Sequence, residues 1–368
     1  MENDAMTEQE LEKALRTAAE ADVAVIFAGL PEIFESEGYD RTSMKLPKCQ
    51  DRLIEEVLKV QPNVVVVLHN GSPVELPWAD RVSAILEMYL GGQGVGEACD
   101  WLLFGEANPS GRLAETFPYR LEDNPSFLHF PGNEKRVLYG EDIFVGYRYY
   151  DTKKVPVRYA FGHGLSYTEF TYGDLTLSSA QMTDEDILTV SLKVKNSGKT
   201  EGKEVVQLYV ADLCGTPERP VKELKGFAKV HLLPGEEKTV SMEISARNLS
   251  YYEERLGDWY APSGTYRILI GHASDDIRLH ADIVFKTKKK LPLRVDFTTT
   301  FGELLDHTKT APVITELLAP LAAAAASAEG MSDEYKKLGE QVIREMPLKF
   351  LLGQMPGEQV EQLIGQLN

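Results

Sequence analysis

Hydrophobic and polar positions follow two different periods along the chain, and the change falls near residue 170. Before that point, apolar runs alternate with segments of helical period, and the runs cover residues 21–30, 63–69 and 83–90. Runs without polar alternation are typical of parallel strands that helices cover on both faces. We therefore expect residues 21–30 to form a central strand of a mostly parallel sheet in a three-layer α/β sandwich.

Two helices are predicted around the first strand. Thr7 and Glu10 have the spacing of a capping box, which begins a helix whose apolar residues share one face. Pro47 is suited to open a second helix, because proline is tolerated in the first turn. An alternation of strand and helix of this kind indicates an α/β domain over residues 1–170.

After residue 170 the pattern changes to strict alternation, which is typical of strands with one buried face. Leu188, Val190, Leu192 and Val194 alternate with polar residues, and the same pattern recurs over 206–210, 240–244, 266–270 and 279–285. Glycine-containing turn signals separate these segments. The pattern predicts an all-β, fibronectin type III-like sandwich over residues 171–287.

Helical spacing returns after the basic linker 286–290. Three short amphipathic segments, around residues 314–321, 335–343 and 360–367, are separated by breaks at Pro347 and Pro356. Helices of this length bury their apolar stripes by packing together or onto a partner. We therefore predict an α-helical tail over residues 288–368.

Composition and charge exclude several classes of partner. The formal net charge of −18 disfavours nucleic acid and anionic membrane surfaces, whereas a neutral sugar is unaffected. The three cysteines Cys49, Cys99 and Cys214 are isolated, so neither a disulfide framework nor a metal site is indicated. No cofactor is expected. The acidic start lacks the basic and apolar regions of a signal peptide, and we expect a cytoplasmic protein.

A glycine-rich loop at residues 91–94 suggests nucleotide binding at first sight. Its spacing matches neither the dinucleotide fingerprint nor the phosphate loop, because no further glycine or alanine and no Gly-Lys-Ser/Thr follows where those motifs need them. Close backbone packing at the start of a helix is the favoured interpretation.

Candidate chemistry lies where the predicted strands end. Glu37 follows the first strand, and the turn Asn70–Ser72 and the glycine-rich loop follow the next two. Ligands in open α/β sheets bind beyond the carboxyl ends of the strands, so these loops should converge there. Glu37 is a candidate acid or base on an exposed loop. We expect its neighbours Asp40 and Arg41 to anchor that loop through ion pairing.

Five motifs, read together, reveal a family resemblance. They are Ser36–Arg41 (SEGYDR), Asn70–Glu75 (NGSPVE), Asn108–Leu113 (NPSGRL) with Thr116–Pro118, Tyr139–Tyr150 (YGEDIFVGYRYY) and Phe161–Tyr167 (FGHGLSY). In this order and spacing the chain resembles the C-terminal half of a β-glucosidase of glycoside hydrolase family 3. The resemblance implies that Glu37 is the general acid/base and that a fibronectin type III-like module follows the α/β domain.

The resemblance also implies a partner. In this family the nucleophilic Asp lies in a (β/α)₈ barrel, which needs about 250 residues of alternating strand and helix. Only about 170 residues of this chain alternate in that way. We therefore expect a barrel domain or subunit as partner and a β-glucoside or oligosaccharide as substrate. The sequence assigns no substrate-binding residue.

Two alternatives stay open at this point. A non-catalytic carbohydrate-binding or scaffolding relative would keep the fold without the chemistry, and a family 3 β-xylosidase would differ only in its sugar. The intact motif Ser36–Arg41 favours an enzyme, because a scaffold has no chemical need for the Glu37 carboxylate.

Overall fold

The computed structural model describes residues 4–133, 135–216, 219–326 and 332–368, so the first three residues of the acidic start lie outside it. The chain divides into two compact units. One comprises Met1–Ser250 with Ala261–Lys288, and the other comprises Tyr251–Tyr260 with Lys289–Asn368.

The first unit begins with a parallel sheet of three strands in the order β1-β2-β3. The strands are β1 (Ala24–Gly29), β2 (Val64–His69) and β3 (Ala84–Glu87). The central strand is therefore β2, and the prediction that residues 21–30 form a central, doubly covered strand is wrong. On β1, Val25 is 43% and Phe27 is 61% exposed, whereas Val66 and Val67 on opposite faces of β2 are fully buried.

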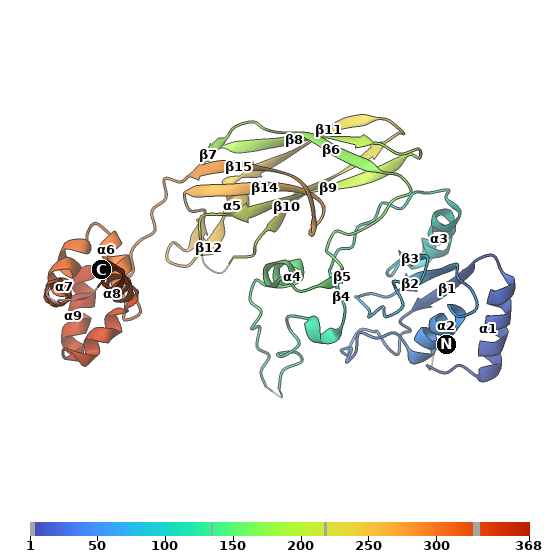
Figure 1. The fold of residues 1–368 in the computed structure, drawn as a ribbon, viewed down its shortest axis with the longest axis horizontal. Helices are drawn as coiled ribbons and strands as arrows, with labels where there is room; N and C mark the ends of the chain where they lie inside the picture. The colour runs from blue at the N-terminus through green and yellow to red at the C-terminus, as the bar shows by residue number, and fades with distance from the viewer. Residues whose placement is uncertain (1–3, 134, 217–218, 327–331) are drawn as a thin grey trace. The chain divides into compact units, whose positions relative to one another are not determined.

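Helices lie on both sides of this sheet, as the three-layer prediction requires (Figure 1). Helices α1 (Glu8–Glu20) and α2 (Lys48–Val57) bury Ala18, Ile54 and Val57 in one core with residues of β1 and β2. Helix α3 (Val95–Phe104) lies on the other side and follows the short 3₁₀ turn η1 (Gly92–Gly94). The predicted capping box of Thr7 and Glu10 begins α1, and Pro47 is the N-cap of α2.

A long connection leads from α3 to the β-sandwich. It contains the antiparallel pair β4 (Phe117–Pro118) and β5 (Val157–Tyr159), the 3₁₀ turn η2 (Leu121–Asp123) and helix α4 (Tyr147–Lys153). Helix α4 contacts the sandwich directly. The Leu224 amide donates to the Tyr147 hydroxyl at 2.7 Å, and Lys222 pairs with Asp151 at 2.7 Å.

The sandwich consists of two sheets with the orders β10-β9-β14-β15-β7 and β11-β8-β6. Its strands are β6 (Phe170–Leu177), β7 (Gln181–Thr183), β8 (Ile187–Asn196), β9 (Gly202–Asp212), β10 (Glu223–Leu232), β11 (Glu237–Ser245), β14 (Gly264–Ala273) and β15 (Asp276–Lys286). The short helix α5 (Ala246–Leu249) follows β11. The alternating residues Leu188, Val190, Leu192 and Val194 of β8 are buried in the core, as their period predicts.

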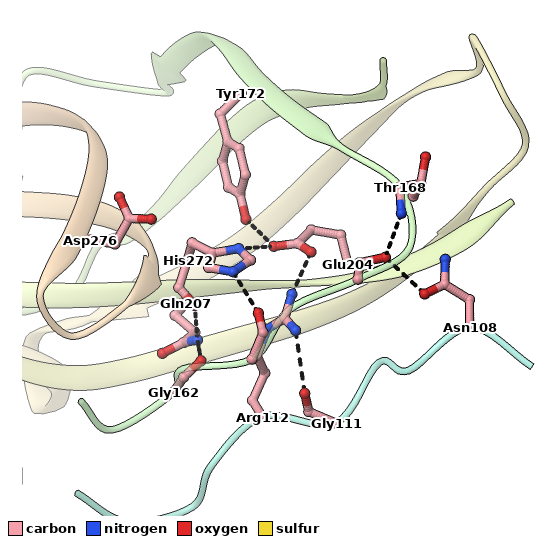
Figure 2. Close-up of polar contacts among 12 residues, drawn as sticks. Asn108, Gly111, Arg112, Gly162, Thr168, Tyr172, Glu204, Gln207, His272 and Asp276 are labelled. Carbon is pink, nitrogen blue, oxygen red and sulfur yellow. Dashed lines mark hydrogen bonds and ion pairs between the residues drawn. The ribbon is translucent and has the colours of Figure 1, made fainter. Parts of the chain in front are cut away.

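A buried polar cluster joins the connection to the sandwich (Figure 2). Glu204 of β9 is fully buried, and its carboxylate lies 2.6 Å from the Arg112 guanidinium and 2.7 Å from His272 Nδ1. The Tyr172 hydroxyl donates to the same carboxylate at 2.5 Å. Nearby, the Gln207 amide donates to the Gly162 carbonyl at 3.1 Å. A buried carboxylate needs such partners, because its desolvation would otherwise be very costly.

The second unit contains the predicted helical tail and a small hairpin of β12 (Tyr251–Glu253) and β13 (Asp258–Tyr260). Its helices are α6 (Phe301–Asp306), α7 (Ala311–Ala326), α8 (Asp333–Glu345), the 3₁₀ helix η3 (Leu348–Gly353) and α9 (Gly357–Leu367). Ile314, Leu318, Val360 and Leu367 pack into one core, as the helical spacing predicts. The apolar residues Tyr335, Leu338 and Val342 of α8 stay exposed instead. None of the described helices is long and apolar enough to cross a membrane.

Candidate active site

The carboxyl ends of the three parallel strands carry a group of carboxylates. Strand β1 is followed by the loop that contains Glu35 and Glu37, strand β2 is followed by the turn Asn70–Ser72, and β3 ends at Glu87. Parallel pairing places these ends on one edge of the sheet. Direct contacts between the loop after β1 and the turn after β2 confirm the predicted convergence for these two segments.

Glu35 makes most of these contacts. Its Oε2 accepts a hydrogen bond from the Gly71 amide at 2.6 Å, and its Oε1 accepts one from the Ser72 hydroxyl at 2.8 Å. A Cβ atom at Gly71 would lie 3.1 Å from Glu35 Oε2 and 3.2 Å from Leu90 in the loop after β3. Glycine at position 71 therefore lets the loops after all three strands approach closely.

Arg41 completes the anchor of the loop. Its Nη1 lies 3.4 Å from Glu35 Oε1 and donates to the Ser72 hydroxyl oxygen at 2.6 Å. The Arg41 and Glu35 side chains are 17% and 19% exposed, so this pair is largely shielded from water. The ion pair expected of Arg41 is confirmed, but its partner is Glu35. Asp40 is exposed, and no described residue bonds to its side chain.

Glu37 is placed quite differently. It lies in a turn next to Gly38, whose φ of 95° suits glycine, and its side chain is exposed. Within the described parts of the chain, no hydrogen bond or ion pair reaches the Glu37 carboxylate. The expectation of an exposed Glu37 is confirmed, and both of its oxygens are available to a substrate.

Glu87 and Glu115 bring two more carboxyl groups to this edge. Glu87 accepts hydrogen bonds from the Tyr89 amide at 2.8 Å and from the Asn70 side chain at 3.2 Å. Burial raises the pKa of Glu87 to about 7, and the negative charges of Glu115 and Glu35 act in the same direction. Burial and the charge of Glu35 also raise the pKa of Glu115, while Arg41 opposes that shift.

A cavity of about 440 Å³ lies beside Arg41 and Glu115. Thr116 and Glu141 also line it, and each has a buried side-chain oxygen without a partner among the described residues. Glu37 does not line this cavity. The exposed carboxylate and the cavity are thus separate features of the sheet edge.

The sequence did not single out Glu35, Glu87 or Glu115. The signal that identified Glu37, a carboxylate at the carboxyl end of an apolar run, also applies to Glu87 at the end of β3. For Glu35 the sequence holds no comparable signal, because its role depends on the distance to Gly71 and Ser72. Among the described residues, no group of His, Cys, Asp or Glu side chains is arranged to hold a metal ion.

The remaining glycine motifs have structural roles. A Cβ at Gly91 would lie 2.5 Å from Val95, which supports close packing at the start of α3. In the segment Phe161–Gly164, the carbonyl oxygens of Gly162 and Gly164 contact Gln207 and His272 of the sandwich. The ring of His163 stacks on Tyr159, with 5.0 Å between the ring centroids.

Comparison with protein families matches two stretches of the chain. Residues 1–167 match the model of the glycosyl hydrolase family 3 C-terminal domain, and residues 204–274 match the fibronectin type III-like domain. The chain is 46% identical over 372 residues to the thermostable β-glucosidase B of Acetivibrio thermocellus. It is 45% identical over 286 residues to a β-glucosidase of Kluyveromyces marxianus.

These relatives are much longer than the chain. The match to the A. thermocellus protein covers the whole chain but only 49% of that protein. The match to the K. marxianus protein covers 77% of the chain and 33% of that protein. In solved structures, too, the chain matches less than half of each relative. The K. marxianus β-glucosidase in complex with glucose matches 77% of the chain with a TM-score of 0.73, 43% identity and 34% of its own length. A Bifidobacterium adolescentis GH3 β-glucosidase matches 84% with a TM-score of 0.78, 39% identity and 46% of its length.

Proposed function

Because the chain belongs to glycosyl hydrolase family 3, with the C-terminal domain of that family at residues 1–167, we propose that it is part of an exo-acting β-glucosidase. Glu37 acts as the general acid/base on a terminal β-linked glucose of a glucoside or oligosaccharide. The nucleophilic Asp comes from a (β/α)₈ barrel, present as a further domain or as a separate subunit. The names of the relatives, all β-glucosidases, support this substrate class.

The chemistry of retaining glycosidases requires two carboxyl groups about 5 Å apart. The acid protonates the leaving oxygen while the nucleophile attacks the sugar carbon, and the resulting carboxylate then removes a proton from the water that releases the sugar. Glu37 suits the first role, because both of its oxygens are exposed on an anchored loop. The proposal rests on this observation, an exposed Glu37 carboxylate on an anchored loop.

The strand that precedes the Glu37 loop also suits a partner. Val25 and Phe27 of β1 are exposed, and neighbouring exposed apolar side chains are typical of contact surfaces. A barrel that covered Glu37 would exclude water from the proposed site.

A chimera tests the proposal. In the A. thermocellus β-glucosidase B, the part that matches this chain is replaced by the chain itself. We expect the chimera to hydrolyse an aryl β-glucoside and the chain alone not to do so. Glu37→Gln should lower kcat/KM of the chimera by about 10²–10⁴-fold. The matched control Glu32→Gln, an exposed carboxylate of the same loop, should retain activity.

Three outcomes would contradict the proposal. A folded chimera without activity would favour a non-catalytic relative, and a preference for β-xylosides would favour a xylosidase. Robust turnover by the chain alone would require a second catalytic carboxylate within these 368 residues.

A further inference from the structure

We propose that Glu35 is a positioning residue that fixes the loop bearing Glu37 to the turn after β2. The inference rests on the role proposed for Glu37 and assigns a different role to a second glutamate of the same loop. Only Ser36 separates the two in sequence, yet Glu35 contacts Gly71 and Ser72, whereas no described residue bonds to the Glu37 side chain.

The contacts of Glu35 engage both of its carboxylate oxygens. Oε2 accepts from the Gly71 amide, and Oε1 accepts from the Ser72 hydroxyl and faces the Arg41 guanidinium. Three donors therefore converge on this one carboxyl group, and both of its oxygens are engaged. Glu35 is therefore held as an acceptor, and its contacts serve to hold the loop.

The same contacts close the loop around Glu37. The Glu35–Arg41 pair joins two positions on either side of Glu37, and both residues contact Ser72 of the neighbouring turn. The Tyr39 hydroxyl also donates to the Glu32 carbonyl, which links two further positions of the loop. The segment that presents Glu37 is thus tied at its base to the sheet edge, while the Glu37 side chain itself stays free.

This arrangement matches what an acid/base residue needs. A proton donor acts only when it lies within hydrogen-bond reach of the leaving oxygen, and a displacement of about 1 Å can lower the rate by about 10²-fold. An untethered, exposed loop would spread Glu37 over many positions. The Glu35 contacts reduce the number of positions that Glu37 can take, and they leave the Glu37 carboxylate unoccupied.

Hydrogen exchange of the full chain tests the anchor without any enzymatic activity. In Glu35→Gln, one oxygen acceptor becomes an amide donor, and in Ser72→Ala one donor is lost. We expect amide exchange across residues 34–41 to accelerate by about tenfold in both variants, with α1 and α2 unchanged. The control Glu32→Gln should leave loop exchange at the wild-type rate. Unchanged exchange in Glu35→Gln would overturn the proposal.

Kinetics of the active chimera test the positioning role. Glu35→Gln should lower kcat by about 10- to 100-fold while KM changes less than about twofold. The Glu35→Gln/Ser72→Ala double variant should lose little more than Glu35→Gln alone, because both substitutions remove the same contact. If Glu35→Ala, rather than Glu37→Ala, lost activity mainly on poor leaving groups and regained it with azide, Glu35 would itself be the proton donor and the proposal would be wrong.

The two tests separate this inference from the proposed function. An inactive wild-type chimera would count against the β-glucosidase proposal, whereas the exchange experiment would still decide whether Glu35 holds the loop. Normal exchange in the variants of an active chimera would remove the positioning role and leave the assignment of Glu37 intact.

Discussion

Glu87 at the end of β3 holds a carboxyl group that burial keeps largely out of water. Its pKa of about 7 lies above the ordinary value of 4.5, so between these two pH values the folded chain binds more protons than the unfolded chain. The contribution of Glu87 to stability is therefore complete below pH 4.5 and is lost as the pH rises through 7. At about 1.36 kcal/mol per pKa unit, the loss amounts to roughly 3 kcal/mol at most.

Urea unfolding at pH 5 and pH 8 measures this effect. The free energy of unfolding of Glu87→Gln should fall less between the two pH values than that of the wild type. Glu97→Gln, which changes an exposed carboxylate of α3, should keep the wild-type difference. Identical pH dependence in Glu87→Gln and the wild type would show that the carboxyl group of Glu87 is not buried as described.

At the scale of residues, the sequence was informative where a residue's position along a strand decides its role. Glu37 could be located because it follows an apolar run, and its exposure was predicted correctly. Its catalytic role stays a prediction. Glu35 and Glu115 could not be found in this way, because their surroundings are created by segments that lie far apart in the sequence.

At the scale of elements, strand β1 shows the limit of reading apolar runs. Its sequence is as apolar as that of β2, yet Val25 and Phe27 are exposed while β2 is covered on both faces. Apolar content indicates that a strand is suited to burial. The place of the strand in the sheet, however, depends on which strands pair with it. The β-sandwich was predicted better, since strict alternation reports directly which face is buried.

The exposure of β1 predicts a contrast between two substitutions. Phe27→Thr should change the free energy of unfolding by less than about 0.5 kcal/mol, because most of the ring is already in water. Ile54→Ala in α2 should cost about 2–5 kcal/mol, since Ile54 is fully buried. Chemical denaturation of both variants is the measurement. A loss above about 2 kcal/mol in Phe27→Thr would mean that β1 is covered in solution.

At the scale of the whole molecule, the five family motifs divide into two groups. Ser36–Arg41 and Asn70–Glu75 meet at the sheet edge, through the contacts of Arg41 with Ser72. The other three motifs contact the sandwich, through Arg112, Tyr147 and the carbonyl groups of Gly162 and Gly164. All five motifs could be identified in the sequence. Which of them lie at the sheet edge and which contact the sandwich is decided by tertiary contacts. The domain boundaries near residues 170 and 287 stay predictions.

The buried Glu204 cluster should contribute strongly to the stability of the contact between the Arg112 segment and the sandwich (Figure 2). Burial alone would raise the pKa of Glu204, but the hydrogen bond from His272 and the charge of Arg112 outweigh it and lower the pKa. Glu204→Gln leaves the buried Arg112 without its ion pair and should cost about 3–5 kcal/mol in denaturant unfolding. Glu243→Ala on the exposed face of β11 is the control and should cost less than about 0.5 kcal/mol. Equal stability of Glu204→Gln and the wild type would contradict the account of this interface.

The central claim, that Glu37 is the general acid/base, is tested most directly by the leaving-group dependence of Glu37→Ala in the active chimera. An acid is needed most when the leaving group is poor, so hydrolysis of alkyl β-glucosides should be slowed far more than that of aryl β-glucosides with good leaving groups. Azide should restore part of the rate on the good leaving groups, because it attacks the glycosyl-enzyme without a general base. Equal losses on good and poor leaving groups, without rescue by azide, would contradict the account and remove Glu37 from the acid/base role.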